Sequence, residues 1–142
     1  MKKSNRSNVD PFIVMDVMES ARKAEEQGEN IIHMEVGQPG TPAPKIAKEF
    51  VIKEINKNSL GYTVALGLPE LRNRISKLYG DWYNIDLNPK RVVITTGSSG
   101  AFILSFSALF DSGDRVGIGS PSYPSYRQIL KSLSLETIDI QT

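Results

Sequence analysis

The second half of the sequence alternates between short apolar runs and longer helical patterns, and this alternation constrains the fold more than any other feature. It predicts strands at residues 91–95, 115–118 and 135–140, and helices at residues 99–110 and 122–133. Strands that alternate with helices of this length form parallel sheets. The predicted fold class is therefore α/β. The first of the two helices is apolar on most faces, so we expect it to be buried on more than one side.

The first half of the chain predicts helices and a loop. An N-cap acceptor followed by proline, Asp10-Pro11, marks the start of a helix that should end at Gly28. Further elements are expected as a short strand at 31–36 and as helices at 44–56 and 69–83. Between the strand and the next helix, three prolines and two glycines in eight residues exclude regular structure and predict a loop of fixed shape.

Composition excludes several kinds of site. The 142 residues contain no cysteine and one histidine, His33, and carry a formal net charge of +1. Without cysteine there is no disulfide framework and no thiolate ligand or nucleophile, and one histidine makes a metal site unexpected. We interpret His33 as a structural or surface residue. The balanced charge argues against nucleic acid or an anionic membrane as a partner.

Apolar runs in the chain are short. None approaches the roughly 18 consecutive residues that a membrane span needs, and the basic start lacks the apolar core of a signal peptide. We therefore expect a cytoplasmic protein. The sequence stops directly after the strand at 135–140, which would leave an uncovered parallel edge, so we expect the chain to be cut rather than finished.

The segment VVITTGSSGAF at residues 92–102 runs from a predicted strand through small residues into a predicted helix. A helix N-terminus presents free N–H groups and a partial positive charge, so Gly97, Ser98 and Ser99 are candidates to bind an anion such as a phosphate. No lysine follows as in a P-loop, and the nearest dinucleotide fingerprint, at residues 117–122, lacks its third glycine. A plain turn of small residues remains the alternative.

A second candidate follows the next predicted strand. The segment PSYPSY at residues 121–126 puts aromatic residues at the carboxyl end of that strand, where open α/β sheets bind ligands. Tyr123 could stack on a flat ring whose phosphate is held nearby. The alternative is an ordinary loop aromatic packed on the surface.

Taken together, these segments resemble the fold-type I pyridoxal-phosphate enzymes, specifically the class I and II aminotransferases that include aspartate aminotransferase. Five motifs in the family's order carry the resemblance: VGQPG, GYTVALGLPELR, TTGSSGA, DSGDRV and PSYPSY. The likeness corresponds to the N-terminal portion of such an enzyme. It implies an N-terminal arm with a small-domain segment and the substrate loop at residues 1–44, and the first part of the cofactor-binding large domain at residues 45–142.

The resemblance also implies site residues and partners. Gly97, Ser98 and Ser99 would bind the phosphate of pyridoxal 5'-phosphate, and Tyr123 would stack on its ring. Tyr62 would reach the cofactor phosphate of the other subunit in a homodimer, and Gly37 would lie near the substrate carboxylate. The substrates would be an amino acid and a 2-oxo acid. No nucleic acid or membrane partner is implied.

No catalytic residue is expected within the chain, because the family's Schiff-base lysine would lie downstream. The lysines present, such as Lys77, Lys90 and Lys131, read as solvated surface charges, so we expect these residues alone to be inactive. Three alternatives stay open: a lyase or decarboxylase of the same fold, a noncatalytic remnant that binds a phosphate ligand or a partner protein, and a nucleotide-binding protein.

Overall fold

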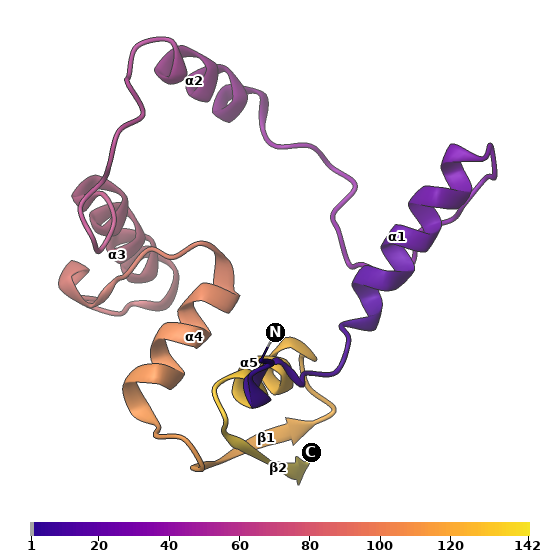
Figure 1. The fold of residues 1–142 in the computed structure, drawn as a ribbon. Coiled ribbons are helices and arrows are strands. Elements are labelled where there is room, and N and C mark those ends of the chain that lie inside the picture. Colours follow the sequence, from indigo (N-terminus) through magenta and orange to yellow (C-terminus); the bar gives the residue numbers. More distant parts are fainter. Residues whose placement is uncertain (1) are drawn as a thin grey trace. The chain divides into compact units, whose positions relative to one another are not determined.

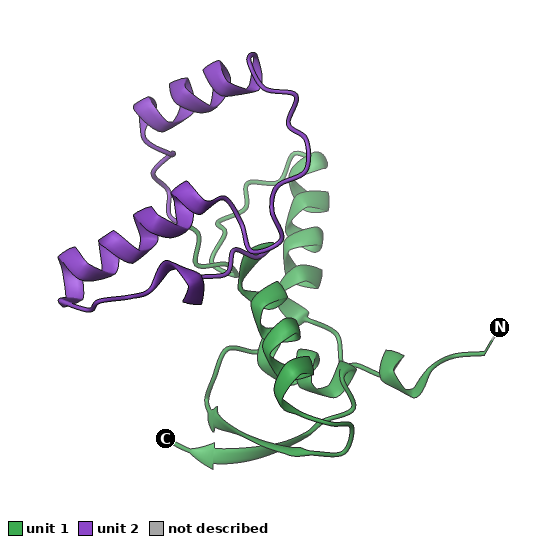
Figure 2. Cartoon of the chain, turned by 90° about the vertical axis from the view of Figure 1, so that its left-hand side faces the viewer, with its two compact units in different colours: residues 1–38, 96–142 green, residues 39–95 purple. Residues whose placement is uncertain are grey.

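The structure, a computed structural model, describes residues 2–142 (Figure 1). Its elements are, in chain order, η1 (Asn5–Ser7), α1 (Ile13–Glu26), α2 (Lys45–Ile55), α3 (Pro69–Tyr83), η2 (Pro89–Arg91), α4 (Gly97–Leu109), β1 (Arg115–Ser120), α5 (Ser125–Ser132) and β2 (Glu136–Gln141). The chain divides into two compact units, one of residues 1–38 with 96–142 and one of residues 39–95 (Figure 2). No helix among the described residues is long and apolar enough to cross a membrane.

The sheet of the first unit consists of β1 and β2, which pair in parallel with Arg115 opposite Glu136 and Ser120 opposite Gln141. The connection between them runs through α5, which packs on β2. This arrangement confirms the predicted α/β class with parallel strands. The described core is small and lies where α5 ends and β2 begins, at Ile129, Leu130 and Leu135.

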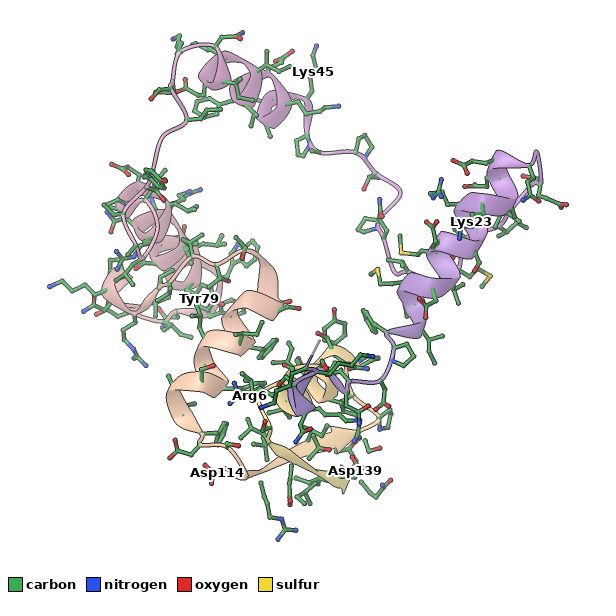
Figure 3. All side chains as sticks on the ribbon, viewed as in Figure 1. Arg6, Lys23, Lys45, Tyr79, Asp114 and Asp139 are labelled. Atoms are coloured by element: carbon green, nitrogen blue, oxygen red, sulfur yellow. The ribbon has the colours of Figure 1, made fainter. Side chains whose placement is uncertain are left out.

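Ion pairs tie α5 to its surroundings. Arg127 pairs with Asp139 of β2, and Figure 3 shows Asp139 on that strand. Lys131 Nζ lies 3.0 Å from Asp10 Oδ2 in the N-terminal segment. The predicted start of the first helix is wrong: the Asp10 carboxylate faces Lys131 instead of capping the helix. Helix α1 begins only at Ile13, after Phe12, which provides no side-chain cap.

The helix predicted at 122–133 begins later than expected, at Ser125. Proline disfavours helical backbone in the residue before it, so Tyr123 stays outside the helix. Instead, Tyr126 N–H donates to the Tyr123 carbonyl at 3.2 Å and closes a turn around Pro124. The helix at 69–83 forms as predicted, with Pro69 in its first turn.

The second unit contains α2, α3 and η2. Arg72 of α3 donates from Nε to the carbonyl of Val92 and from Nη2 to that of Pro89, both at 2.8 Å. These bonds hold the extended segment after η2 against α3. Gly67, with φ +95°, lies so close to Ile94 that a Cβ there would be 2.4 Å from Ile94 Cγ1.

Two predicted strands are not formed. Residues 31–36 and 91–95 lack β pairing in the described part of the chain: Arg91 belongs to η2, and Val92 has extended dihedrals but no partner strand. Ile94 N–H instead donates to the Leu66 carbonyl in a loop. Apolar alternation encodes an extended chain with a buried face, but a strand also needs a neighbour to complete its ladder.

The expectation that α4 is buried on several sides is also not met within residues 2–142. It packs on α5, and Ile103, Leu104 and Leu109 are exposed. An apolar helix is buried only as far as other elements cover it.

Candidate functional site

The N-terminus of α4 is built from the small residues that the sequence singled out. The helix begins at Gly97 rather than at the predicted Ser99, so Gly97, Ser98 and Ser99 all lie in its first turn. Gly97 has φ +78°, a left-handed conformation that glycine adopts readily. Within the described chain, the side chain of Thr96 makes no capping hydrogen bond.

This donor set suits a phosphate. The first N–H groups of an α-helix have no carbonyl partner in the helix itself, and the helix dipole adds a partial positive charge at that end. Ser98 and Ser99 add hydroxyl donors. The first turn of α4 carries no acidic side chain, and Gly97 and Ser98 are exposed. The residues present therefore fit the phosphate group of pyridoxal 5'-phosphate.

Tyr123 follows the carboxyl end of β1, as predicted. Tyr123 is 47% exposed. On the protein side it meets Tyr126, with ring centroids 5.4 Å apart and planes at 78°. Ser120–Pro121, between the strand and this loop, is a cis peptide.

Two contacts join α4 to the first turn of α5, which directly follows Tyr123 and Pro124. Ser99 Oγ lies 3.4 Å from Ser125 Oγ, and the rings of Phe102 and Tyr126 meet edge to face at 4.7 Å. Four of the predicted residues, Gly97, Ser98, Ser99 and Tyr123, thus belong to one compact unit whose two segments touch.

The other two predicted residues, Gly37 and Tyr62, are both exposed. Gly37 is exposed and belongs to the same unit. Tyr62 belongs to the other unit and its side chain is fully exposed.

Three residues that make these supporting contacts were not predicted as site residues: Ser125, Tyr126 and Phe102. The available signal was the spacing of PSYPSY, in which the second tyrosine follows the first by three residues. Once Pro124 is read as the second residue of a turn, that spacing brings the two tyrosines together.

His33, on the segment that leads to Gly37, is held by two carboxylates. Its Nδ1 lies 2.7 Å from Glu35 Oε1, and its Nε2 lies 3.0 Å from Glu25 Oε1 of α1. Hydrogen bonds to Glu35, the larger cause, and to Glu25 raise the pKa of His33 to about 9. The hydrogen bond between His33 and Glu35 also lowers the pKa of Glu35. We call this arrangement the His33 clamp.

The His33 imidazole should titrate near pH 9 rather than at its ordinary value of 6.5. Because the folded pKa is the higher one, the clamp contributes its full stability below about pH 6.5 and loses it as the pH rises through about 9. Glu35, whose folded pKa is lowered, contributes above its ordinary value of 4.5 and loses that contribution as the pH falls through its folded pKa.

A proton NMR titration measures this value, with His33→Gln identifying the imidazole signal. Glu35→Gln should lower the midpoint more than Glu25→Gln, because the bond to Glu35 is the larger cause of the shift. A midpoint near 6.5 in the unsubstituted protein would contradict the clamp.

The sequence profile of the family "Aminotransferase class I and II" matches residues 29–142. The valine–pyruvate aminotransferase of Mycobacterium tuberculosis is 44% identical over 135 residues, which cover 95% of this chain and 35% of that protein.

Several solved structures match the whole chain, and two of them illustrate the similarity. One, of a protein assigned as an aminotransferase from Silicibacter pomeroyi, is 62% identical with a TM-score of 0.84, over 36% of its own length. The other, an aminotransferase from Mycobacterium tuberculosis, is 42% identical with a TM-score of 0.93, over 37% of its length. The chain thus spans little more than a third of the relatives it matches. The profile match over most of its residues shows that the chain belongs to the class I and II aminotransferase family.

Proposed function

We propose that this chain supplies the phosphate-binding and ring-stacking part of a pyridoxal-phosphate-dependent aminotransferase, an enzyme that moves an amino group between an amino acid and a 2-oxo acid. Members of the family depend on this cofactor. The observation that carries the proposal is the contact between α4 and the first turn of α5, which directly follows Tyr123, within one compact unit.

Each residue at this site has a distinct task. The amides of Gly97, Ser98 and Ser99, with the two serine hydroxyls, hold the phosphate dianion at the positive end of α4. Tyr123 offers its ring face to the pyridine ring and thereby sets the ring's plane. A phosphate held at one end and a ring held on one face leave little freedom to rotate, which keeps the reacting carbon in place.

When bound, the cofactor supplies an electron sink for the carbon that loses its proton. The lysine that binds the cofactor covalently is expected outside residues 1–142. Within the chain, Lys77 and Lys90 are exposed and Lys131 is paired with Asp10, so none has the desolvated setting that lowers the pKa of a nucleophilic lysine.

The remaining assignments extend the proposal. Gly37 lies next to the substrate carboxylate, and Tyr62 binds the cofactor phosphate of the partner subunit in a homodimer. The exposure of Tyr62 leaves its side chain accessible for that role. Residues 1–44 form the arm, small-domain segment and substrate loop, and residues 45–142 begin the large domain.

The test is an amino-transfer assay on the protein expressed from its complete reading frame. With ¹⁵N-labelled amino acid and an unlabelled 2-oxo acid, we expect label in the second amino acid, and only when pyridoxal phosphate is bound. Cofactor-dependent release of ammonia or carbon dioxide would favour a lyase or decarboxylase. Absence of cofactor binding would favour a noncatalytic binding protein.

A further inference from the structure

The contacts behind Tyr123 single out a residue to which neither the sequence motifs nor the family resemblance gave a role. We propose that Tyr126 is a positioning residue, which holds the Tyr123 ring against α4, the helix whose first turn would bind the phosphate, and so fixes the plane on which the cofactor ring stacks. This inference rests on the proposed function.

Tyr126 holds Tyr123 in two ways. Its backbone N–H donates to the Tyr123 carbonyl at 3.2 Å, which closes the turn around Pro124. Its ring also meets the Tyr123 ring nearly at right angles, with centroids 5.4 Å apart. The main chain and the side chain of Tyr123 are therefore both fixed from one residue.

The same Tyr126 ring meets α4 on another side. Its centroid lies 4.7 Å from that of Phe102, with the planes at 74°. Phe102 lies one turn after Ser99 and is stacked on Phe106, with centroids 5.7 Å apart. Tyr126 is thus the aromatic link between the helix that holds the phosphate and the tyrosine that holds the ring.

The ring of Tyr126, rather than its hydroxyl, makes these contacts. Tyr126 is partly buried, whereas Tyr123 is 47% exposed. The Tyr126 ring therefore supports the Tyr123 ring, which is left to face the ligand. Within the described residues, no hydrogen bond involves the Tyr126 hydroxyl. Phenylalanine at position 126 should therefore preserve the positioning of Tyr123, whereas leucine should not.

The expected size of the effect follows from the geometry. Each edge-to-face aromatic pair is worth roughly 2- to 12-fold in an equilibrium constant. Tyr126→Leu removes two such pairs while keeping the backbone bond. We expect the dissociation constant of pyridoxal phosphate to rise about tenfold, together with a changed circular dichroism of the bound cofactor, which reports the asymmetry of its surroundings.

The experiment compares four proteins expressed from the complete reading frame: the unsubstituted protein, Tyr126→Leu, Tyr126→Phe and Phe106→Leu. Cofactor affinity is measured by equilibrium dialysis, and cofactor orientation by visible circular dichroism. Tyr126→Phe should match the unsubstituted protein in both. Phe106→Leu, the matched control, loses two aromatic pairs, with Phe102 and with Phe110, neither of which involves Tyr123. It should also match the unsubstituted protein. If Tyr126→Leu does not fold, Phe102→Leu removes one of the same pairs from the other side.

Unchanged affinity and dichroism in Tyr126→Leu, while the unsubstituted protein binds the cofactor, would overturn the role of Tyr126 alone. Equal losses in Tyr126→Leu and Tyr126→Phe would overturn it too, because the hydroxyl would then be the active group. If the unsubstituted protein binds no pyridoxal phosphate, the proposed function fails, and the role of Tyr126 fails with it.

Discussion

Ser98→Asp should weaken the binding of pyridoxal phosphate on the order of 100-fold without unfolding α4. At about 4 Å, two like charges near a protein surface repel by up to roughly 4 kcal/mol, and solvent exposure reduces that to about half. The substitution also removes one hydroxyl donor, worth about 1 kcal/mol. Yet an aspartate in the first turn of a helix is stabilising by about 0.3–1 kcal/mol, because it complements the helix dipole.

In Ser98→Asp, cofactor affinity should therefore fall while the thermal stability rises slightly. This combination distinguishes the loss of a phosphate site from damage to the fold. Ser98 suits this test better than Ser99, whose hydroxyl lies 3.4 Å from Ser125 Oγ. Ser98→Ala is the matched control and should weaken binding by only about threefold to tenfold. Equilibrium dialysis and thermal unfolding measure the two effects. If Ser98→Asp binds the cofactor as tightly as Ser98→Ala does, the phosphate lies elsewhere.

Gly67→Ala should lower the free energy of unfolding by about 3 kcal/mol. At φ +95°, a residue with a side chain costs about 1–2 kcal/mol more than glycine. The new Cβ would also lie 2.4 Å from Ile94 Cγ1 and 2.6 Å from Ile94 Cβ, and such overpacking typically costs another 1–3 kcal/mol. Ile94 has little room to retreat, because its N–H is bonded to the Leu66 carbonyl.

Gly40→Ala is the control for this effect, since a Cβ there would meet nothing within 4 Å. It should change stability by less than about 0.5 kcal/mol. Urea titration followed by circular dichroism compares both variants with the unsubstituted protein. Equal stability of Gly67→Ala and Gly40→Ala would show that the close approach of Gly67 to Ile94 is absent in solution.

Local signals in the sequence predicted those parts of the fold whose interactions are local. The helix at 69–83 formed within the predicted bounds because proline at its start fixes the entry. The parallel pair of β1 and β2 was predictable because a helix of crossover length separates two short apolar runs.

What depends on distant partners was not predictable from the residues. The run at 92–95 has the pattern of a strand but finds no neighbour among the described residues. The carboxylate of Asp10 has the chemistry of a helix cap, but it is turned toward Lys131, which lies 121 positions away in the sequence. In neither case does the local pattern reveal which distant group the segment will meet.

The candidate site, too, was predictable only in its local features. Small residues at the start of a helix, suited to bind an anion, can be anticipated from TTGSSGA. The start of α4 at Gly97 rather than Ser99, and the positive φ of Gly97, were not predicted. The support by Tyr126 and Ser125 could not be anticipated so directly, because it depends on how α4 and α5 pack against each other.

The most direct test of the account is a crystal structure, with pyridoxal phosphate, of the protein expressed from its complete reading frame. We predict phosphate oxygens within about 3.2 Å of the amide nitrogens in the first turn of α4, and the pyridine ring on the face of Tyr123. A phosphate bound elsewhere, with the Gly97 turn making no contact to it, would contradict the central claim.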